Sequence, residues 1–221
     1  MKNQENNEKP ITGLAKEICI WQDRQQCEDC TLNKCLFCEP DTKYLFYFLT
    51  PFLLIIISVL VGIIFSPIKP IIKILFFIGW FGYMFFFLNI WESKMLCNHC
   101  PYYANDSEKV LHCPIDKGKL KTGNYEPGPA SIAEKVQFIV GASMLIAFPI
   151  PFLLFYNLII PLLLSIMGIF LWILSLQLKI CTECINFSCP LNRVSEEIRN
   201  EFLKRNPVIK KAWEQKGYEI D

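Results

Sequence analysis

The chain has 221 residues, of which 52% are hydrophobic and 19% are charged, and its formal net charge is +1. The chain has 22 basic and 21 acidic residues, so it lacks the excess of basic residues that marks nucleic-acid-binding proteins. We therefore expect no nucleic acid as a partner. The high apolar content points instead to insertion into a lipid bilayer.

Four long apolar stretches are predicted to span a membrane as helices. They are Tyr44–Phe65, Ile71–Trp91, Val136–Tyr156 and Leu158–Leu178. With a rise of ~1.5 Å per residue, a helix of about 21 residues matches the ~30 Å hydrocarbon core of a bilayer. Their one charged residue, Lys73, lies near the end of its stretch, where a long side chain can reach the interface. A soluble helical protein would need polar helix faces, which these stretches lack.

The connections between the stretches predict the topology. Residues 66–70 join the first two stretches and little more than Asn157 joins the last two, so we expect two helical hairpins. The N-terminal segment, the central loop and the C-terminal tail then share one side of the membrane. Every Lys and Arg except Lys69 and Lys73 lies on that side, and the positive-inside rule places it in the cytoplasm. The prediction is a multi-pass cell-membrane protein with both termini cytoplasmic.

The predicted fold class is an all-α integral membrane protein with a small, irregular, cysteine-rich cytoplasmic cap. Its expected parts are a Cys-rich N-terminal segment (1–43), a first transmembrane hairpin (44–91), a Cys/His loop (92–135), a second transmembrane hairpin (136–178) and a Cys-rich helical tail (179–221). Local signals add an amphipathic helix over residues 14–26, a capping box from Ser131 to Glu134, a kink at Pro149 and a break in the tail at Asn206 and Pro207.

All eleven cysteines and both histidines lie outside the predicted spans, on the shared side. In a reducing cytoplasm, thiols are more often metal ligands or redox groups than structural disulfides. Cysteines that served only as small buried hydrophobes would be expected within the apolar helices as well, and those helices contain none. The distribution therefore favours a chemical role.

The spacing of these residues predicts metal ligation. CxxC pairs recur near the N-terminus and directly after the second and fourth spans, and two later cysteines precede proline. A CxxC turn directs two sulfurs at a common centre, and a histidine beside a cysteine can supply a nitrogen ligand. The predicted metal ligands are Cys27, Cys30, Cys35, Cys38, Cys97, His99, Cys100, His112, Cys113, Cys181, Cys184 and Cys189.

A weak internal repeat leaves two groupings of these ligands open. Each half of the chain has a hairpin, a CxxC pair at its end and a later Cys-Pro. In one grouping the two CxxC pairs, Cys97 with Cys100 and Cys181 with Cys184, close one four-sulfur site. In the other, each half keeps its own three cysteines, and His99 or His112 completes the first set.

The residue types leave the ion, and therefore the function, undecided. Zinc is the usual structural ion of CxxC pairs, whereas the recurrence of Cys-Pro favours an iron–sulfur cluster. The leading hypothesis is an iron–sulfur electron-transfer module that passes electrons to a protein partner on the cytoplasmic face. The alternatives are a zinc-structured membrane scaffold or assembly factor and a thiol–disulfide oxidoreductase. No motif of a known enzyme class is present, so no catalytic residue is predicted.

Overall fold

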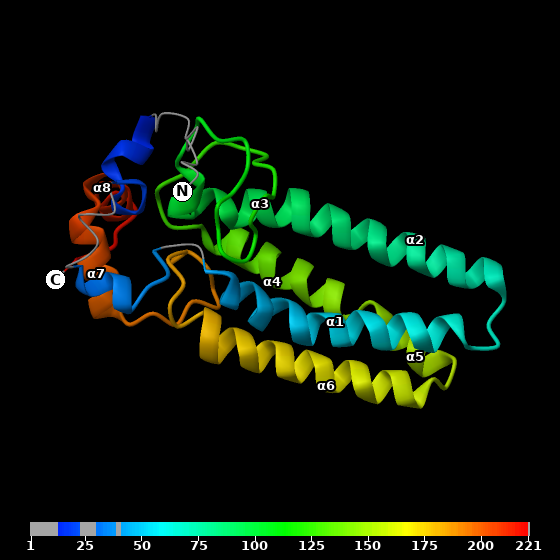
Figure 1. Ribbon diagram of the computed structural model, residues 1–221. Helices are drawn as coiled ribbons and strands as arrows, with labels where there is room; N and C mark the ends of the chain where they lie inside the picture. The colour runs from blue at the N-terminus through cyan, green and yellow to red at the C-terminus, as the bar shows by residue number, and fades with distance from the viewer. Residues whose placement is uncertain (1–12, 23–29, 39–40, 221) are drawn as a thin grey trace, which may run out of the picture.

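The computed structural model describes residues 13–22, 30–38 and 41–220. Within this part the chain is helical, with one isolated β-bridge between Val110 and Leu120. Figure 1 shows a bundle of long helices with a smaller body of short helices and loops at one end. The described parts of both terminal segments lie at that end, and the turns that connect the long helices within each half lie at the other.

Four helical segments are long and apolar enough to cross a membrane, as predicted. The first is α1 (Thr42–Ile64), and the second begins as α2 (Pro70–Phe86) and continues with little interruption to His99. The third comprises α4 (Ile132–Ala147) and α5 (Pro149–Phe155), and the fourth is α6 (Ile159–Ser175) with a further turn to Ile180. The second segment is longer than predicted because Glu92, Ser93 and Lys94 continue the helix beyond the apolar stretch.

The local signals in the third and second segments act as expected. Ser131 and Glu134 form a capping box that starts α4. The helix breaks between Ala147 and Pro149, because proline cannot donate the next backbone hydrogen bond. In the second segment, the Lys73 Nζ donates to the carbonyl oxygens of Ile64 and Ser66, each at 2.7 Å, at the end of α1. The ammonium group thus satisfies carbonyls that a helix end leaves unpaired.

The lateral packing of the helices differs from two self-contained hairpins. α1 makes its most extensive contacts with α6, and the two lie side by side (Figure 1). α2 lies against α4, where the Trp80 indole donates to the Leu145 carbonyl at 3.3 Å and the Tyr83 hydroxyl to the Gly141 carbonyl at 3.0 Å. Each close pair therefore combines one helix from each half of the chain.

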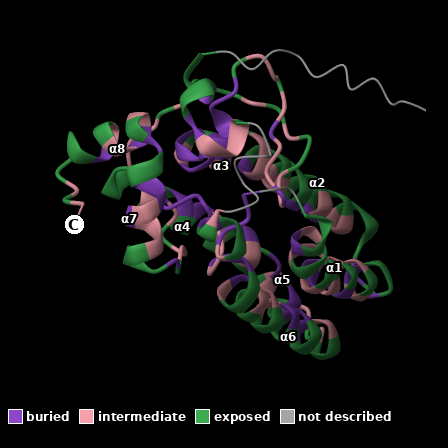
Figure 2. Cartoon of the chain, turned by 60° about the vertical axis from the view of Figure 1, so that its left-hand side comes forward, coloured by how far each residue is buried: buried purple, intermediate pink, exposed green. Residues whose placement is uncertain are grey.

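The outer surface of the bundle is apolar. Large hydrophobic side chains are exposed along all four segments, and Phe65 and Phe155 at the far end are 83% and 80% exposed. Figure 2 shows exposed residues along the outside of these helices, whereas buried residues concentrate inward and in the body at the bundle end. Apolar surface this extensive is expected to contact lipid.

We call the body at the bundle end the cap. It comprises the described residues of 13–38, 92–131 and 181–220, with η1 (Gly13–Glu17), η2 (Cys19–Trp21), η4 (Thr31–Lys34), α3 (Glu92–Met95), η6 (Cys97–His99) and η7 (Pro101–Tyr103). The tail contributes α7 (Glu196–Arg205) and α8 (Pro207–Glu214), which meet at the predicted break. The predicted amphipathic helix over residues 14–26 is wrong in its described part, which forms the short 3-10 turns η1 and η2.

One apolar core joins the three parts of the cap. Ile18 and Leu32 from the N-terminal segment, Tyr102 from the central loop and Phe202 and Trp213 from the tail are buried in the same cluster. The apolar face of the tail helices thus packs inside the molecule and does not form a free docking surface. None of these parts is long enough to bury a core alone, so the cap holds its shape through contacts between distant parts of the chain.

Candidate metal centre

A cavity of about 320 Å³ lies where the cap meets the helix bundle. Its membrane side is formed by side chains of α1, α4 and α6, including Phe48, Phe138 and Trp172. Its cap side contains six of the predicted metal ligands, three from each half of the chain: Cys97, Cys100, Cys113, Cys181, Cys184 and Cys189. The cysteines of both groupings that the sequence left open therefore border the same cavity.

The helix ends position both CxxC pairs. A π-helical turn, η5 (Phe87–Trp91), lies shortly before Cys97, and a second one, η8 (Leu176–Ile180), ends directly before Cys181. Single π turns in long helices occur often at functional sites, because they rotate the residues that follow. The presence of one before each CxxC pair extends the internal repeat from sequence to conformation.

Loop hydrogen bonds position the two cysteines that precede proline. The loop carrying Cys113 is closed by the Leu111 amide, which donates to the Lys119 carbonyl at 2.8 Å, and by the Gly118 amide, which donates to the Leu111 carbonyl at 2.9 Å. Before Cys189, the chain is folded back by Asn192, whose side-chain amide donates to the Cys184 and Asn186 carbonyls at 2.7 and 3.1 Å. Both loops direct a cysteine to the cavity that the CxxC pairs border.

The thiols of the cavity interact electrostatically across the two halves. Burial raises the pKa of Cys100 and of Cys184 well above the ordinary value, and the neighbouring thiolate charges of Cys113 and Cys189 raise the pKa of each further. Burial likewise raises the pKa of Cys113 and that of Cys189 to about 12. The charges of cysteines from one half therefore act on cysteines of the other half. Without a compensating cation, these thiols stay protonated.

The sulfurs are arranged more widely than a zinc site requires. A tetrahedral zinc ion with ~2.3 Å bonds holds its sulfur ligands about 3.8 Å apart. Among the described residues, no three cysteine sulfurs lie within 4.8 Å of one another. The six thiols border a cavity of about 320 Å³, which has room for a larger group than a single ion.

A charged network borders the cavity next to Cys97. The Lys119 Nζ donates to the Glu92 carboxylate at 2.8 Å and lies 3.9 Å from the Cys97 sulfur, which is also 3.9 Å from the Asp116 carboxylate. Sequence reasoning missed these residues. Glu92 could have been noticed as the first charge after an apolar span, but Asp116 and Lys119 lie in a loop without any motif. An ammonium group here can offset the negative charge of a thiolate.

The remaining predicted cysteine ligands do not line the cavity where the structure describes them. Cys30 and Cys35 are partly exposed and Cys38 is buried, and none of the three lines the cavity as the described residues define it. The Arg205 guanidinium donates to the Cys30 sulfur at 3.1 Å. Cys27 lies outside the described residues. Cys38 nevertheless lies in the same buried cluster as Cys100 and Tyr102, so it lies near the cavity without lining it.

Neither histidine is among the residues lining the cavity. The His112 ring lies edge-on to Trp21, with ring centres 5.9 Å apart, and its Nε2 is 3.9 Å from the Glu108 carboxylate. The His99 ring is buried and contacts backbone carbonyls of the central loop and Glu134 at the start of α4. Neither ring is therefore a lining group of the cavity, and the grouping with His99 or His112 as a ligand stays a prediction.

A scan of known protein families and searches of curated proteins and solved structures find no match for this chain. The function must therefore be argued from the site itself.

Proposed function

We propose that the protein is a membrane-bound electron-transfer module whose cavity holds an iron–sulfur cluster. The observation that carries the proposal is the convergence of six thiols from both halves of the chain on one cavity of about 320 Å³. Iron–sulfur clusters are held by four cysteine thiolates. We assign Cys100, Cys113, Cys184 and Cys189 as the ligands, because the charges of the other three all raise the pKa of Cys184.

The chemistry of the thiols supports a metal cofactor. Four thiolates in a buried space repel one another, and metal cations remove this cost because they bind the deprotonated sulfur directly. The size of the cavity, about 320 Å³, favours a cluster over the single zinc ion of the scaffold alternative. When bound, a cluster would supply one-electron transfer at a potential set by its hydrogen bonds and burial.

The same features weigh against thiol–disulfide exchange. Reactive cysteines have a lowered pKa and partial exposure. Here Cys100 is buried and Cys184 is partly exposed, but burial raises the pKa of each. Such thiols are poor nucleophiles at neutral pH without a metal, so we rank the oxidoreductase alternative below the other two.

The position of the cavity suggests where the electrons go. It lies at the end of the bundle that we assign to the cytoplasm, so a cytoplasmic protein partner can approach from the cap side. Electron transport through the bilayer would need further cofactors, and the four apolar stretches of the sequence contain no histidine that could hold a haem. We therefore propose transfer at the cytoplasmic face.

The test is anaerobic purification of the full-length protein, followed by iron and sulfide analysis, visible absorption and electron paramagnetic resonance of the reduced form. We expect a coloured protein with both elements present. Replacing Cys100 or Cys184 with serine should abolish the absorption and resonance signals of the cluster. Cys35→Ser, which changes a side chain that does not line the cavity, should leave these signals unchanged. A colourless protein with stoichiometric zinc would instead establish the scaffold alternative.

A further inference from the structure

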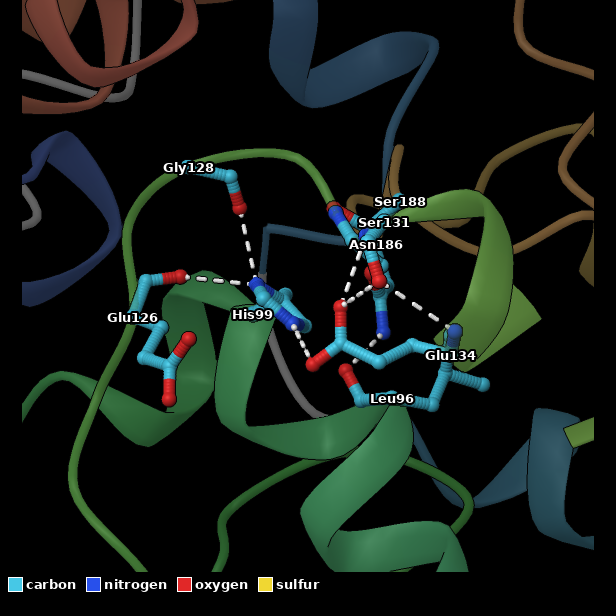
Figure 3. Close-up of polar contacts among 9 residues, drawn as sticks. Leu96, His99, Glu126, Gly128, Ser131, Glu134, Asn186 and Ser188 are labelled. Carbon is cyan, nitrogen blue, oxygen red and sulfur yellow. Dashed lines mark hydrogen bonds and ion pairs between the residues drawn. The ribbon is translucent and has the colours of Figure 1, made fainter. Parts of the chain in front are cut away.

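The side chain of His99 is buried and lies among polar groups (Figure 3). Three parts of the chain meet around it. His99 belongs to η6, Glu126 and Gly128 belong to the central loop, and Glu134 lies in the first turn of α4. The His99 side chain is only 3% exposed, so its polar atoms need partners inside the protein.

The surroundings of His99 determine which ring nitrogen carries hydrogen. Nδ1 lies 2.8 Å from the Gly128 carbonyl oxygen and 3.1 Å from the Glu126 carbonyl oxygen. Both oxygens only accept hydrogen bonds, so Nδ1 must be the donor. In the neutral ring, Nε2 then presents a lone pair. Histidines that bind metals are commonly oriented in this way, with the other ring nitrogen donating to a carbonyl.

Nε2 is buried and has no hydrogen-bond partner among the described residues. It lies 3.6 Å from Oε1 of Glu134, which is too long for a good hydrogen bond. Glu134 is held in place by its other oxygen, Oε2, which accepts from the amide and hydroxyl of Ser131, each at 2.7 Å. A lone pair and a carboxylate oxygen thus face each other with a gap between them. Bonds of ~2.0–2.1 Å to one tetrahedral ion would place two such atoms roughly 3.4 Å apart.

A second carboxylate completes the group. One potential ligand atom from each of His99, Glu126 and Glu134 lies within 4.8 Å of the other two. The Glu126 backbone is anchored, because its amide donates to the Asn98 carbonyl at 2.8 Å. Its carboxylate makes no hydrogen bond or ion pair in the part of the chain that the structure describes. This carboxylate is therefore available as a ligand at no cost to the fold.

We propose that His99, Glu126 and Glu134 form a divalent metal site distinct from the thiol cavity. One neutral imidazole and two carboxylates balance the charge of a divalent cation, and a nitrogen–oxygen set suits ions such as zinc, manganese or ferrous iron. The ion would join the end of the second membrane segment, the central loop and the start of the third. It would thereby fix the turn that presents Cys97 and Cys100 to the cavity.

Manganese is the appropriate probe, because it prefers oxygen and nitrogen ligands and competes poorly for thiolates. The full-length protein, purified in detergent and treated with a chelator, would be titrated with Mn²⁺ while the magnetic resonance signal of the free ion is followed. We expect one tightly bound ion per chain. Glu126→Gln should weaken binding by at least about tenfold, since even outer-shell changes weaken metal sites by roughly 10–100-fold.

Two control variants distinguish Mn²⁺ binding at this site from Mn²⁺ binding elsewhere in the protein. Glu108→Gln removes the carboxylate beside the other histidine and should leave Mn²⁺ binding unchanged. Cys35→Ser, which removes a thiol that does not line the cavity, should also leave it unchanged. The proposal is overturned if the wild type binds no Mn²⁺, or if Glu126→Gln binds it as well as Glu108→Gln does. A simple ion pair between His99 and Glu134 predicts that last outcome.

Discussion

The buried side chain of Asn206 connects the two ends of the chain. It has no solvent exposure. Its Oδ1 accepts from the Cys19 amide at 2.7 Å, and its Nδ2 donates to the Phe202 carbonyl at 2.6 Å. Asn206 also lies directly before Pro207, which begins α8. One amide group thus fixes the joint between the tail helices and attaches the N-terminal segment to it.

Replacing Asn206 with alanine should therefore destabilise the cap. The change leaves the Cys19 amide and the Phe202 carbonyl without this partner in a dry environment, which costs about 1–3 kcal/mol for each buried group left unpaired. Thermal unfolding of the purified protein and limited proteolysis of the N-terminal segment would measure the effect. Asn33→Ala, at an exposed position, is the matched control. Equal stability of the two variants would contradict the structural role of Asn206.

For single residues, the sequence predicts which side chains line the cavity better than it predicts which side chains contact each other. The spacing of the cysteines singled out all six thiols of the cavity, because CxxC and Cys-Pro are local patterns. The spacing could not show that the ring of His99, which lies between Cys97 and Cys100 in the sequence, does not line the cavity. Side chains that are adjacent in sequence point in different directions on a helical turn. Nor could the sequence predict the contact between Lys119 and Glu92, because the path of a loop without a motif is not predictable.

Glycines allow the close approach of α1 and α6. A Cβ atom at Gly62 would lie 2.3 Å from the Cγ of Pro161, and one at Gly168 would lie 2.8 Å from the Cγ1 of Ile55. Small residues at such positions let membrane helices come close enough for extensive packing contacts. The pairing of α1 with α6, helices from different halves of the chain, therefore depends on the absence of a Cβ atom at Gly62 and Gly168.

Gly62→Ala should separate these helices and destabilise the bundle by about 1–3 kcal/mol, the usual cost of overpacking a dense interface. Gly82→Ala is the control, since a Cβ there meets no atom within 4 Å. This control should be neutral or slightly stabilising, because alanine favours helix by about 1 kcal/mol over glycine. Unfolding of both variants in detergent would measure the difference. If both have the stability of the wild type, the close approach of α1 and α6 is wrong.

The sequence predicted the membrane segments but not their partners. Hydropathy marks a stretch as apolar, and prolines and capping residues mark where it breaks or starts, as at Pro149 and Ser131. Lateral pairing depends on the fit between surfaces, which hydropathy does not describe. Short connections suggested that the two helices of each hairpin would be main partners, whereas α1 packs chiefly on α6.

For the whole molecule, the pairing of helices from both halves explains how one cavity receives cysteines from both. The second and fourth segments each end in a π turn followed by a CxxC pair. Because helices of the two halves are interleaved in one bundle, these ends emerge next to each other under the cap. The internal repeat thus produces a site with two similar sides. Such a site is incomplete in either half alone.

The orientation of the molecule follows from its charges and can be tested with thiol reagents. The bundle end opposite the cap carries Lys69, whereas nearly all other basic residues in the described part of the chain lie on the cap side. The positive-inside rule therefore predicts that the cap faces the cytoplasm. In intact cells, a membrane-impermeant maleimide should not label the wild-type protein. It should label Lys69→Cys, which places a thiol at an exposed position on the far side.

After permeabilisation, the same reagent should label the wild type, beginning with the partly exposed Cys30 and Cys35. This second step shows that the absence of labelling in intact cells reflects the membrane barrier and not burial or metal ligation of the thiols. Labelling of the wild type before permeabilisation, with no labelling of the Lys69→Cys thiol, would mean that the cap faces outward. In an oxidising compartment its cysteines would then favour disulfides over an iron–sulfur cluster, so the proposed function depends on this orientation.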